Sequence, residues 1–211
     1  MVRLREMEKL VSEGRISRRE FLRWVSALGL ATVVSPAVLN ISAKAAVPKK
    51  GGRLRLAISG GATTDSLDPA TLADNMPHAI SWQIRNNLVE IDHMGNPIPE
   101  LAESWEAAPG AAKWVFKLRQ GVEFHNGKTL DAEDVVYSIN HHRGEDTKSG
   151  AKSIVRTIAD VQADGKSTLI FTLTGGNADF PYILTDYHLT ISPAGTKGDE
   201  WEKGIGTGGY I

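Results

Sequence analysis

A stretch of small and hydroxyl residues is the first part of the sequence that could bind another molecule. Ser59, Gly60, Thr63, Thr64 and Asp65 lie in it, directly after a run of alternating apolar residues. Glycine leaves backbone N–H and C=O groups approachable, and a loop that leaves the end of a strand is a common position for a binding edge. We therefore take these five residues as the candidate ligand-binding set. The same residue types also suit a turn that binds nothing.

Side chains suited to catalysis or metal binding lack the spacing that such chemistry needs. The six histidines include one adjacent pair, His141 and His142, and neighbours in a helix face different ways. No spacing typical of a metal site is found. Asp131, Glu133 and Asp134 could act as acid–base carboxylates, but capping of a helix N-terminus explains them with fewer assumptions. We predict no metal site, no catalytic residues, no cofactor and no enzymatic activity.

Two features that loosely resemble catalytic or nucleotide-binding motifs lack the required context. The glycine-rich segment 204–209 follows charged residues instead of a strand, and its spacing misses G-x-G-x-x-G, so a dinucleotide site is not predicted. No serine lies in a G-x-S-x-G context, so a hydrolase triad has no support.

The composition excludes several classes of protein. The 211 residues are 41% hydrophobic and 23% charged, which suits a globular chain. The 24 basic and 25 acidic residues give a formal charge of −1, so no basic excess is available for a polyphosphate backbone and no nucleic-acid partner is predicted. The absence of cysteine excludes disulfides, thiolate zinc sites and iron–sulfur clusters.

The first 45 residues have the order of an export signal. Seven basic residues precede the uncharged run 24–39, which Gly29 and Pro36 interrupt. At about 16 residues this run is short of the roughly 20 that a spanning helix needs. The sequence 43–45 then offers the small-x-small pattern that a signal peptidase accepts. We therefore expect a signal peptide over residues 1–45 and a mature chain from residue 46.

Two short segments of this signal indicate where it is cut and which export route it follows. We place the cut between Ala45 and Ala46. The segment 17–23, with its paired Arg18 and Arg19, resembles the twin-arginine motif read by the Tat translocase. The alternative is an amphipathic helix that stays on the protein. Cleavage would leave 16 basic and 21 acidic residues, a charge of −5, which favours solubility.

The rest of the chain predicts a mixture of helices and strands. Alternating apolar residues predict strands, apolar residues three or four apart predict a helix, and Asp131 begins a second helix as its N-cap. The predicted strands are 53–59, 114–119, 122–124 and 168–173, and the first predicted helix is 78–89 with Ile80, Ile84 and Leu88 facing inward. The second and third strands, with their turns, are expected to form a small antiparallel sheet.

Four segments in a fixed order resemble a known family. They are 65–70, 95–105, 116–127 and 130–138, and 177–182 and 206–210 fit as well, although the family usually has proline where Gly209 stands. Together they resemble extracellular solute-binding protein family 5, which serves peptide, opine and nickel ABC importers. Its members are more than twice as long as this chain.

The resemblance implies the large, three-subdomain variety of the type-II periplasmic-binding-protein fold, an α/β fold of which this chain would be the N-terminal portion. Residues 46–80 would open the first lobe, 81–200 would form the inserted subdomain, and 201–211 would return to the first lobe. The second lobe would lie beyond residue 211, so we expect a truncated chain.

The resemblance also implies a function without bond chemistry. A small solute such as a peptide is captured between two lobes, the hinge closes, and the solute passes to the membrane permease subunits of an ABC importer. Ser59 to Asp65 would lie at the cleft, where main-chain groups can pair with an extended ligand. The protein would be periplasmic and soluble after signal cleavage. A truncated non-functional fragment and a Tat-exported cofactor enzyme are the alternatives, and nothing selects peptide over opine, sugar or chelated nickel.

Overall fold

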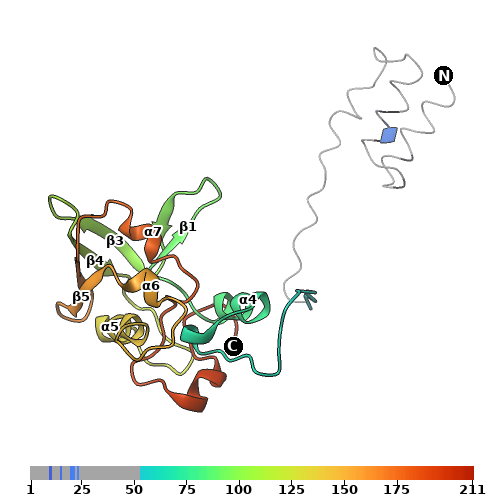
Figure 1. Cartoon of the computed structure of the whole chain (residues 1–211). Helices are drawn as coiled ribbons and strands as arrows, with labels where there is room; N and C mark the ends of the chain where they lie inside the picture. Colours follow the sequence, from blue (N-terminus) through green and yellow to red (C-terminus); the bar gives the residue numbers. More distant parts are fainter. Residues whose placement is uncertain (1–9, 11–14, 16–19, 22, 24–52) are drawn as a thin grey trace, which may run out of the picture. The chain divides into compact units, whose positions relative to one another are not determined.

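The computed structural model describes residues 53–211 and five residues nearer the N-terminus, namely 10, 15, 20, 21 and 23 (Figure 1). Contacts divide the chain into two units, 1–56 and 57–211, and the second contains the helices and strands labelled in Figure 1. Within the described residues, no helix is long and apolar enough to cross a membrane.

The predicted export signal falls outside this description. Arg18 and Arg19 of the twin-arginine motif, and Ala45 and Ala46 at the predicted cleavage site, are not among the described residues. The signal therefore stays a prediction from the sequence.

A four-stranded antiparallel sheet lies at the centre of the second unit. Its strands follow the order β3 (Ala102–Ala107), β4 (Lys113–Leu118), β6 (Thr168–Leu173) and β5 (Ile158–Ala163). The prediction for 168–173 is confirmed with its bounds, and that for 114–119 is confirmed to within one residue at each end. In both strands every second residue is buried, which suits a sheet with one covered face.

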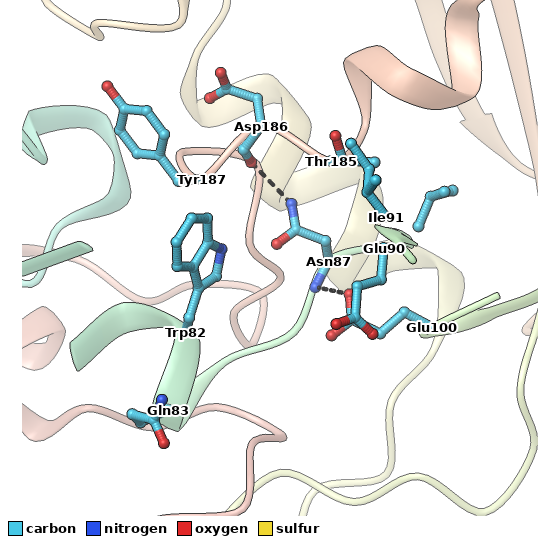
Figure 2. A pocket seen from close by; sticks show the side chains of 10 residues that line it. Trp82, Gln83, Asn87, Glu90, Ile91, Glu100, Thr185, Asp186 and Tyr187 are labelled. Carbon is cyan, nitrogen blue, oxygen red and sulfur yellow. Dashed lines mark hydrogen bonds between the residues drawn. The ribbon is translucent and has the colours of Figure 1, made fainter. Parts of the chain in front are cut away.

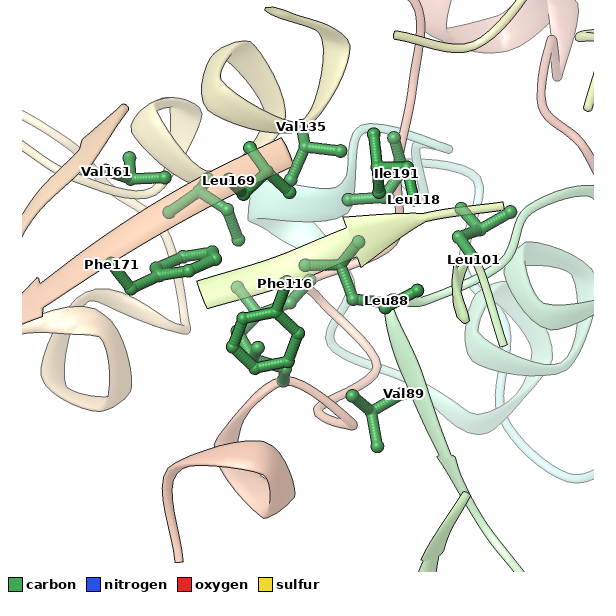
Figure 3. Close-up of a cluster of buried hydrophobic side chains, with 14 of the residues drawn as sticks. Leu88, Val89, Leu101, Phe116, Leu118, Val135, Val161, Leu169, Phe171 and Ile191 are labelled. Atoms are coloured by element: carbon green, nitrogen blue, oxygen red, sulfur yellow. The ribbon is translucent and has the colours of Figure 1, made fainter. Parts of the chain in front are cut away.

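Aromatic side chains from the two central strands pack together in the hydrophobic core (Figure 3). Phe116 of β4 and Phe171 of β6 are completely buried, and their ring centroids lie 5.4 Å apart with the rings at 74°. Phe180, the first residue of α7 (Phe180–Ile183), lies 5.2 Å from Phe171. Such edge-to-face pairs add to the stabilisation from apolar burial, so this cluster holds β4 and β6 together.

Helix α5 (Ala132–His141) packs against β5 and β6. Its N-cap Asp131 accepts a hydrogen bond from the Asp134 N–H at 3.3 Å, and Asp134 accepts one from the Asp131 N–H at 3.0 Å. Asp134 is completely buried and also forms an ion pair with Lys128. This reciprocal capping box satisfies N–H groups that the first helical turn leaves unpaired. The predicted capping role of these carboxylates is confirmed.

The predicted strand over 53–59 is wrong. These residues have no regular secondary structure, and Leu54, Leu56 and Ile58 are 78%, 66% and 41% exposed. Alternating apolar residues form a strand only where a neighbouring strand pairs with their backbone N–H and C=O groups. No strand in the described part of the chain pairs with this run.

The predicted helix over 78–89 begins and ends earlier than expected. Helix α4 spans Asn75–Ile84, and Arg85 takes an extended conformation after it. Ser81 is buried whereas Ile80 is 38% exposed, so the expected inward stripe is wrong at Ile80. Leu88 is buried, but it lies in the extended chain beyond the helix.

The predicted strand over 122–124 also differs from the structure. Only an isolated bridge, Glu123 with Thr129, forms there. In the sheet, β4 pairs instead with β3 on one side and with β6 on the other. A separate hairpin of β1 (Val89–Ile91) and β2 (Pro97–Pro99) precedes β3.

The glycine-rich segment 204–209 packs closely against the end of α4. A Cβ atom on Gly206 would lie 2.0 Å from the Ile84 carbonyl oxygen, and one on Gly208 would lie 2.4 Å from that of Gln83. His125 holds this segment, because its Nδ1 accepts from the Gly206 N–H at 3.3 Å and its Nε2–H donates to the Gly208 carbonyl at 2.9 Å. The glycines therefore serve a close backbone contact.

Candidate functional site

The predicted ligand-binding residues form an open loop. Ser59, Gly60, Thr63 and Thr64 are exposed, and Asp65 is half-buried. No described residue forms a hydrogen bond with the two threonine hydroxyls or with the backbone N–H and C=O groups of Ser59 and Gly60. Backbone groups left without an intramolecular partner can pair with a bound molecule.

Asp65, unlike the other four residues, is hydrogen-bonded within the loop. Its Oδ2 accepts from the Ala62 N–H at 2.7 Å, and its own N–H donates to the Ala62 carbonyl at 3.1 Å. These two bonds close the turn 62–65. The carboxylate therefore shapes the loop, which is the alternative that the residue types had left open.

The loop rests on the start of helix α4. Gly61 donates its N–H to Asp74 Oδ2 at 3.3 Å, and a Cβ atom on Gly60 would lie 2.4 Å from Asp74 Oδ1. Gly60 and Gly61 have φ angles of 88° and 124°, a region that other residues rarely adopt. The conformation thus favours glycine at both positions, and a side chain at Gly60 would also displace the Asp74 carboxylate.

The base of the loop is anchored to distant parts of the chain. Ser66 Oγ donates to Glu202 Oε1 at 2.7 Å, and the Leu67 N–H donates to the same oxygen at 3.2 Å. Arg85 donates from Nη1 to the Leu67 carbonyl at 2.8 Å and from Nη2 to the Trp201 carbonyl at 3.3 Å. Glu202 and Trp201 belong to the 3₁₀ helix η2 (Gly198–Lys203). The loop is therefore open at its tip and held at its base.

Arg85 is the most deeply buried charge of this anchor. Its side chain is 1% exposed, and its guanidinium carbon lies 5.8 Å from the centre of the Trp201 ring. Burial lowers the pKa of Arg85 to about 10, while the charges of Asp68 and Glu202 act to raise it. Arg85 thus stays protonated at neutral pH, and the backbone carbonyls of Leu67 and Trp201 accept hydrogen bonds from its guanidinium.

Histidines that are far apart in the sequence come together beside this anchor. Ring centroids are 6.5 Å apart for His78 and His188, 6.4 Å for His142 and His188, and 5.4 Å for His141 and His142. Nε2 of His141 lies 2.6 Å from Asp68 Oδ1, and Nδ1 of His188 lies 2.7 Å from an oxygen of Asp186. Nowhere in the described residues does a group of three or more histidines and carboxylates suit a metal ion.

His142 is the most buried titratable group of this histidine cluster. Burial lowers its pKa to about 4, and the charges of His141 and His188 act in the same direction. Its Nδ1 lies 2.7 Å from Ser149 Oγ. His142 is therefore neutral at physiological pH and acts as a packed, hydrogen-bonded side chain.

A cavity of about 630 Å³ is lined in part by Tyr187 (Figure 2), whose ring lies at a centroid distance of 3.9 Å from that of His78. It is lined by residues of α4, β1 and the segment 185–187, together with Glu100. Burial raises the pKa of Glu100 to about 7, and the charge of Glu90 adds to this. The cavity could not be predicted from the sequence, because its walls combine residues from 82–100 with residues 185–187.

Comparisons with known proteins identify the family. The family of bacterial extracellular solute-binding proteins, family 5 (middle region), matches residues 96–211, which is more than half of the chain. The chain belongs to this family. The resemblance predicted from the ordered segments is confirmed, and family members are substrate-binding transport proteins.

Individual relatives agree with the family match. The nickel-binding periplasmic protein of Escherichia coli K12 is 30% identical over 69% of this chain and 29% of its own length. AppA from Bacillus subtilis, solved with a nonapeptide, is 26% identical with a TM-score of 0.61, over 68% of this chain and 31% of that chain. AgaA from A. tumefaciens R10, solved with agropinic acid, is 25% identical with a TM-score of 0.62, over 68% of this chain and 30% of that chain.

These relatives settle the fold class and show how much of it this sequence contains. The predicted type-II periplasmic-binding-protein fold, of mixed helices and strands, is confirmed. The chain spans 23% to 30% of the length of the first three curated relatives that it matches. The described residues are thus a part of the family fold.

Proposed function

We propose that this protein is the periplasmic substrate-binding component of an ABC importer, or a part of one, which binds a peptide or a similar small polar solute. It delivers the solute to the membrane permease without making or breaking a bond. Membership of the solute-binding family over residues 96–211 is the observation that carries this proposal. The names of relatives include peptide, nickel and opine ligands, so the proposal is restricted to this range of solutes.

The loop 59–65 is the part of the described chain that we propose to contact the solute. Ser59 and Gly60 would offer backbone groups, and Thr63 and Thr64 would offer hydroxyls. Asp65 would keep the turn in shape. An extended ligand can pair with such free backbone groups, which would supply affinity, while side-chain contacts would supply specificity.

We also propose the subdomain division expected from the resemblance. Residues 46–80 would open the first lobe, 81–200 would form the inserted subdomain, and 201–211 would lead back to the first lobe. The bonds from Ser66 to Glu202 and from Arg85 to Leu67 and Trp201 support this division, since they join all three segments at one place.

Mass spectrometry of the protein isolated from its native cell envelope tests the proposed function. Native spectra should show the chain with an added mass of a small solute, and denatured spectra should show the chain without it. A native mass equal to the denatured mass, together with no thermal shift from alanine peptides of two to five residues, from an opine or from chelated nickel, would refute the proposal.

Paired variants test the role of the loop. Replacing Thr63 and Thr64 with Ala removes two exposed hydroxyls without an intramolecular partner, so thermal stability should stay unchanged while the captured solute is reduced about tenfold. Ser153→Ala, which removes an exposed hydroxyl from α6 (Lys152–Val155), is the matched control and should retain the solute. Equal solute occupancy in all three proteins would exclude these hydroxyls.

Export by the Tat translocase is a separate part of the proposal. Replacing Arg18 and Arg19 with Lys keeps the charge but removes the paired arginines that the receptor reads. The uncleaved precursor should then accumulate in the cytoplasm, as seen by fractionation and immunoblotting. Normal export of this variant would refute the twin-arginine assignment.

A further inference from the structure

The cavity beside Tyr187 has the composition of a binding site for a positive charge. Its lining includes the carboxylates of Glu90, Glu100 and Asp186 and no lysine, arginine or histidine. Two aromatic side chains, Trp82 and Tyr187, complete the wall (Figure 2). Carboxylates and aromatic faces both attract cations, so the two kinds of group favour the same type of occupant.

The aromatic part of the wall is held in position. Tyr187 packs between two histidines, with ring centroids 3.9 Å from His78 and 4.0 Å from His188. Trp82 projects from α4 and is 54% exposed, which is unusual for the largest side chain in proteins. An indole face that the described residues leave uncovered can contact a ligand.

A buried amide adds a fixed acceptor to the cavity. Asn87 is 3% exposed, and its Nδ2 donates to the carbonyls of Leu184 at 3.1 Å and of Asp186 at 2.8 Å. Both amide protons are thus used, and Oδ1 has no hydrogen-bond partner among the described residues. In Figure 2 this oxygen lies on the side of Asn87 that faces Trp82. An acceptor that its own chain's donors leave free can accept a hydrogen bond from an N–H donor on a ligand.

Glu100 is also held at the wall of the cavity. Its two carboxylate oxygens accept from Asn86 Nδ2 at 2.6 Å and from the Asn87 N–H at 2.8 Å. No basic side chain lies among the lining residues to neutralise it or its neighbour Glu90. Arg119 donates from Nε to the Glu100 backbone carbonyl at 3.1 Å, but it does not line the cavity. Two carboxylates on one wall repel each other, and a bound cation would relieve this repulsion.

We propose that this cavity binds a small organic cation in which an ammonium group is attached to an apolar body. The ammonium group would pair with Glu90 and Glu100 and donate to Asn87 Oδ1, while the apolar body would lie on Trp82 and Tyr187. The site goes beyond the proposed transport function, since no residue of the loop 59–65 lines the cavity.

Nuclear magnetic resonance with a matched pair of probes tests this site in the full chain. The probes are phenethylammonium and 2-phenylethanol, which have nearly the same shape and differ in charge. The Trp82 indole N–H signal, assigned with a Trp82→Phe variant, should shift on titration with the amine, and the alcohol should bind about tenfold more weakly. Equal shifts with both probes, or none with the amine up to about 10 mM, would overturn the proposal.

Variants identify the groups responsible for the preference. Replacing both Glu90 and Glu100 with Gln should bring the affinities for amine and alcohol to within about twofold of each other, because the charge is lost while the aromatic wall stays. Glu106→Gln, on the exposed edge strand β3 and outside the cavity, should keep the tenfold preference. An undiminished preference in the double variant would overturn the assignment to these carboxylates. The comparison of the two probes on the unaltered protein needs no variant and so does not depend on folding of the mutants.

Discussion

Replacing Glu100 with Gln should change how the stability of the protein depends on pH. Burial, together with the charge of Glu90, raises the pKa of Glu100 from its usual 4.5 to about 7 in the folded protein. The folded state therefore binds this proton more tightly than the unfolded chain does. The resulting stabilisation is complete below about pH 4.5 and is lost as the pH rises from about 4.5 to about 7.

The size of the effect follows from the shift. A pKa difference of about 2.5 units corresponds to about 3.4 kcal/mol. Glu100 is only half-buried, and solvent screens part of the interaction, so about 1–2 kcal/mol is expected. Gln also places an NH₂ group against either Asn86 Nδ2 or the Asn87 N–H, both of which are donors. This second cost, about 1 kcal/mol, does not depend on pH.

Urea unfolding between about pH 5 and pH 8 separates the two contributions. The free energy of unfolding of Glu100→Gln, relative to the unaltered protein, should rise by about 1–2 kcal/mol over this interval because only the unaltered protein loses stability through this group. The exposed Glu103→Gln on β3 is the control and should show a constant difference. A constant difference for Glu100→Gln as well, or one that falls with pH, would refute the reasoning.

Three further predictions follow from the contacts described above. Asp134→Ala should lower the free energy of unfolding by about 2–4 kcal/mol in urea titrations, since Lys128 and two backbone N–H groups lose their acceptor; a loss under about 0.5 kcal/mol would contradict this. Gly208→Ala should destabilise by at least about 2 kcal/mol and speed amide exchange over 204–210, whereas Gly209→Ala, with open space around it, should not. The His142 ring should titrate near pH 4 by NMR, and its contribution to stability should be lost as the pH falls from about 6.5 to about 4; a midpoint near 6.5 would show that it is not buried.

The elements that could be predicted from the sequence are those whose signals are local. The alternation of β6 and the capping residues of α5 depend on neighbours within one strand or one helical turn, and both were confirmed. The run 53–59 has equally clear alternation, but it has no partner strand in the described part of the chain. Alternation therefore predicts a preference for the extended conformation, and pairing decides whether a strand forms.

The two candidate sites, the loop 59–65 and the cavity beside Tyr187, also differ in whether their signals are local in the sequence. The loop 59–65 was predicted from its residue types, and the structure shows it open, while the contact with a solute stays a prediction. The cavity could not be predicted, because it forms only where the fold brings Trp82 and Glu90 close to Tyr187. His78 and His188 likewise become neighbours only in the folded chain. Spacing along the sequence does not predict which distant residues come into contact in the folded chain.

The anchor at the base of the loop has a consequence for the folding pathway. Ser66 and Glu202 are separated by 136 positions, and Arg85 and Trp201 by 116. The entropic cost of closing a loop grows only with the logarithm of its length, so such long separations reduce the stability of the folded state only slightly. Contacts of such high sequence separation do, however, slow folding. We expect the sheet and α5 to form first, with Arg85 still hydrated, and η2 to dock afterwards. The loop proposed to receive the solute would then acquire its final shape only in the last stage of folding.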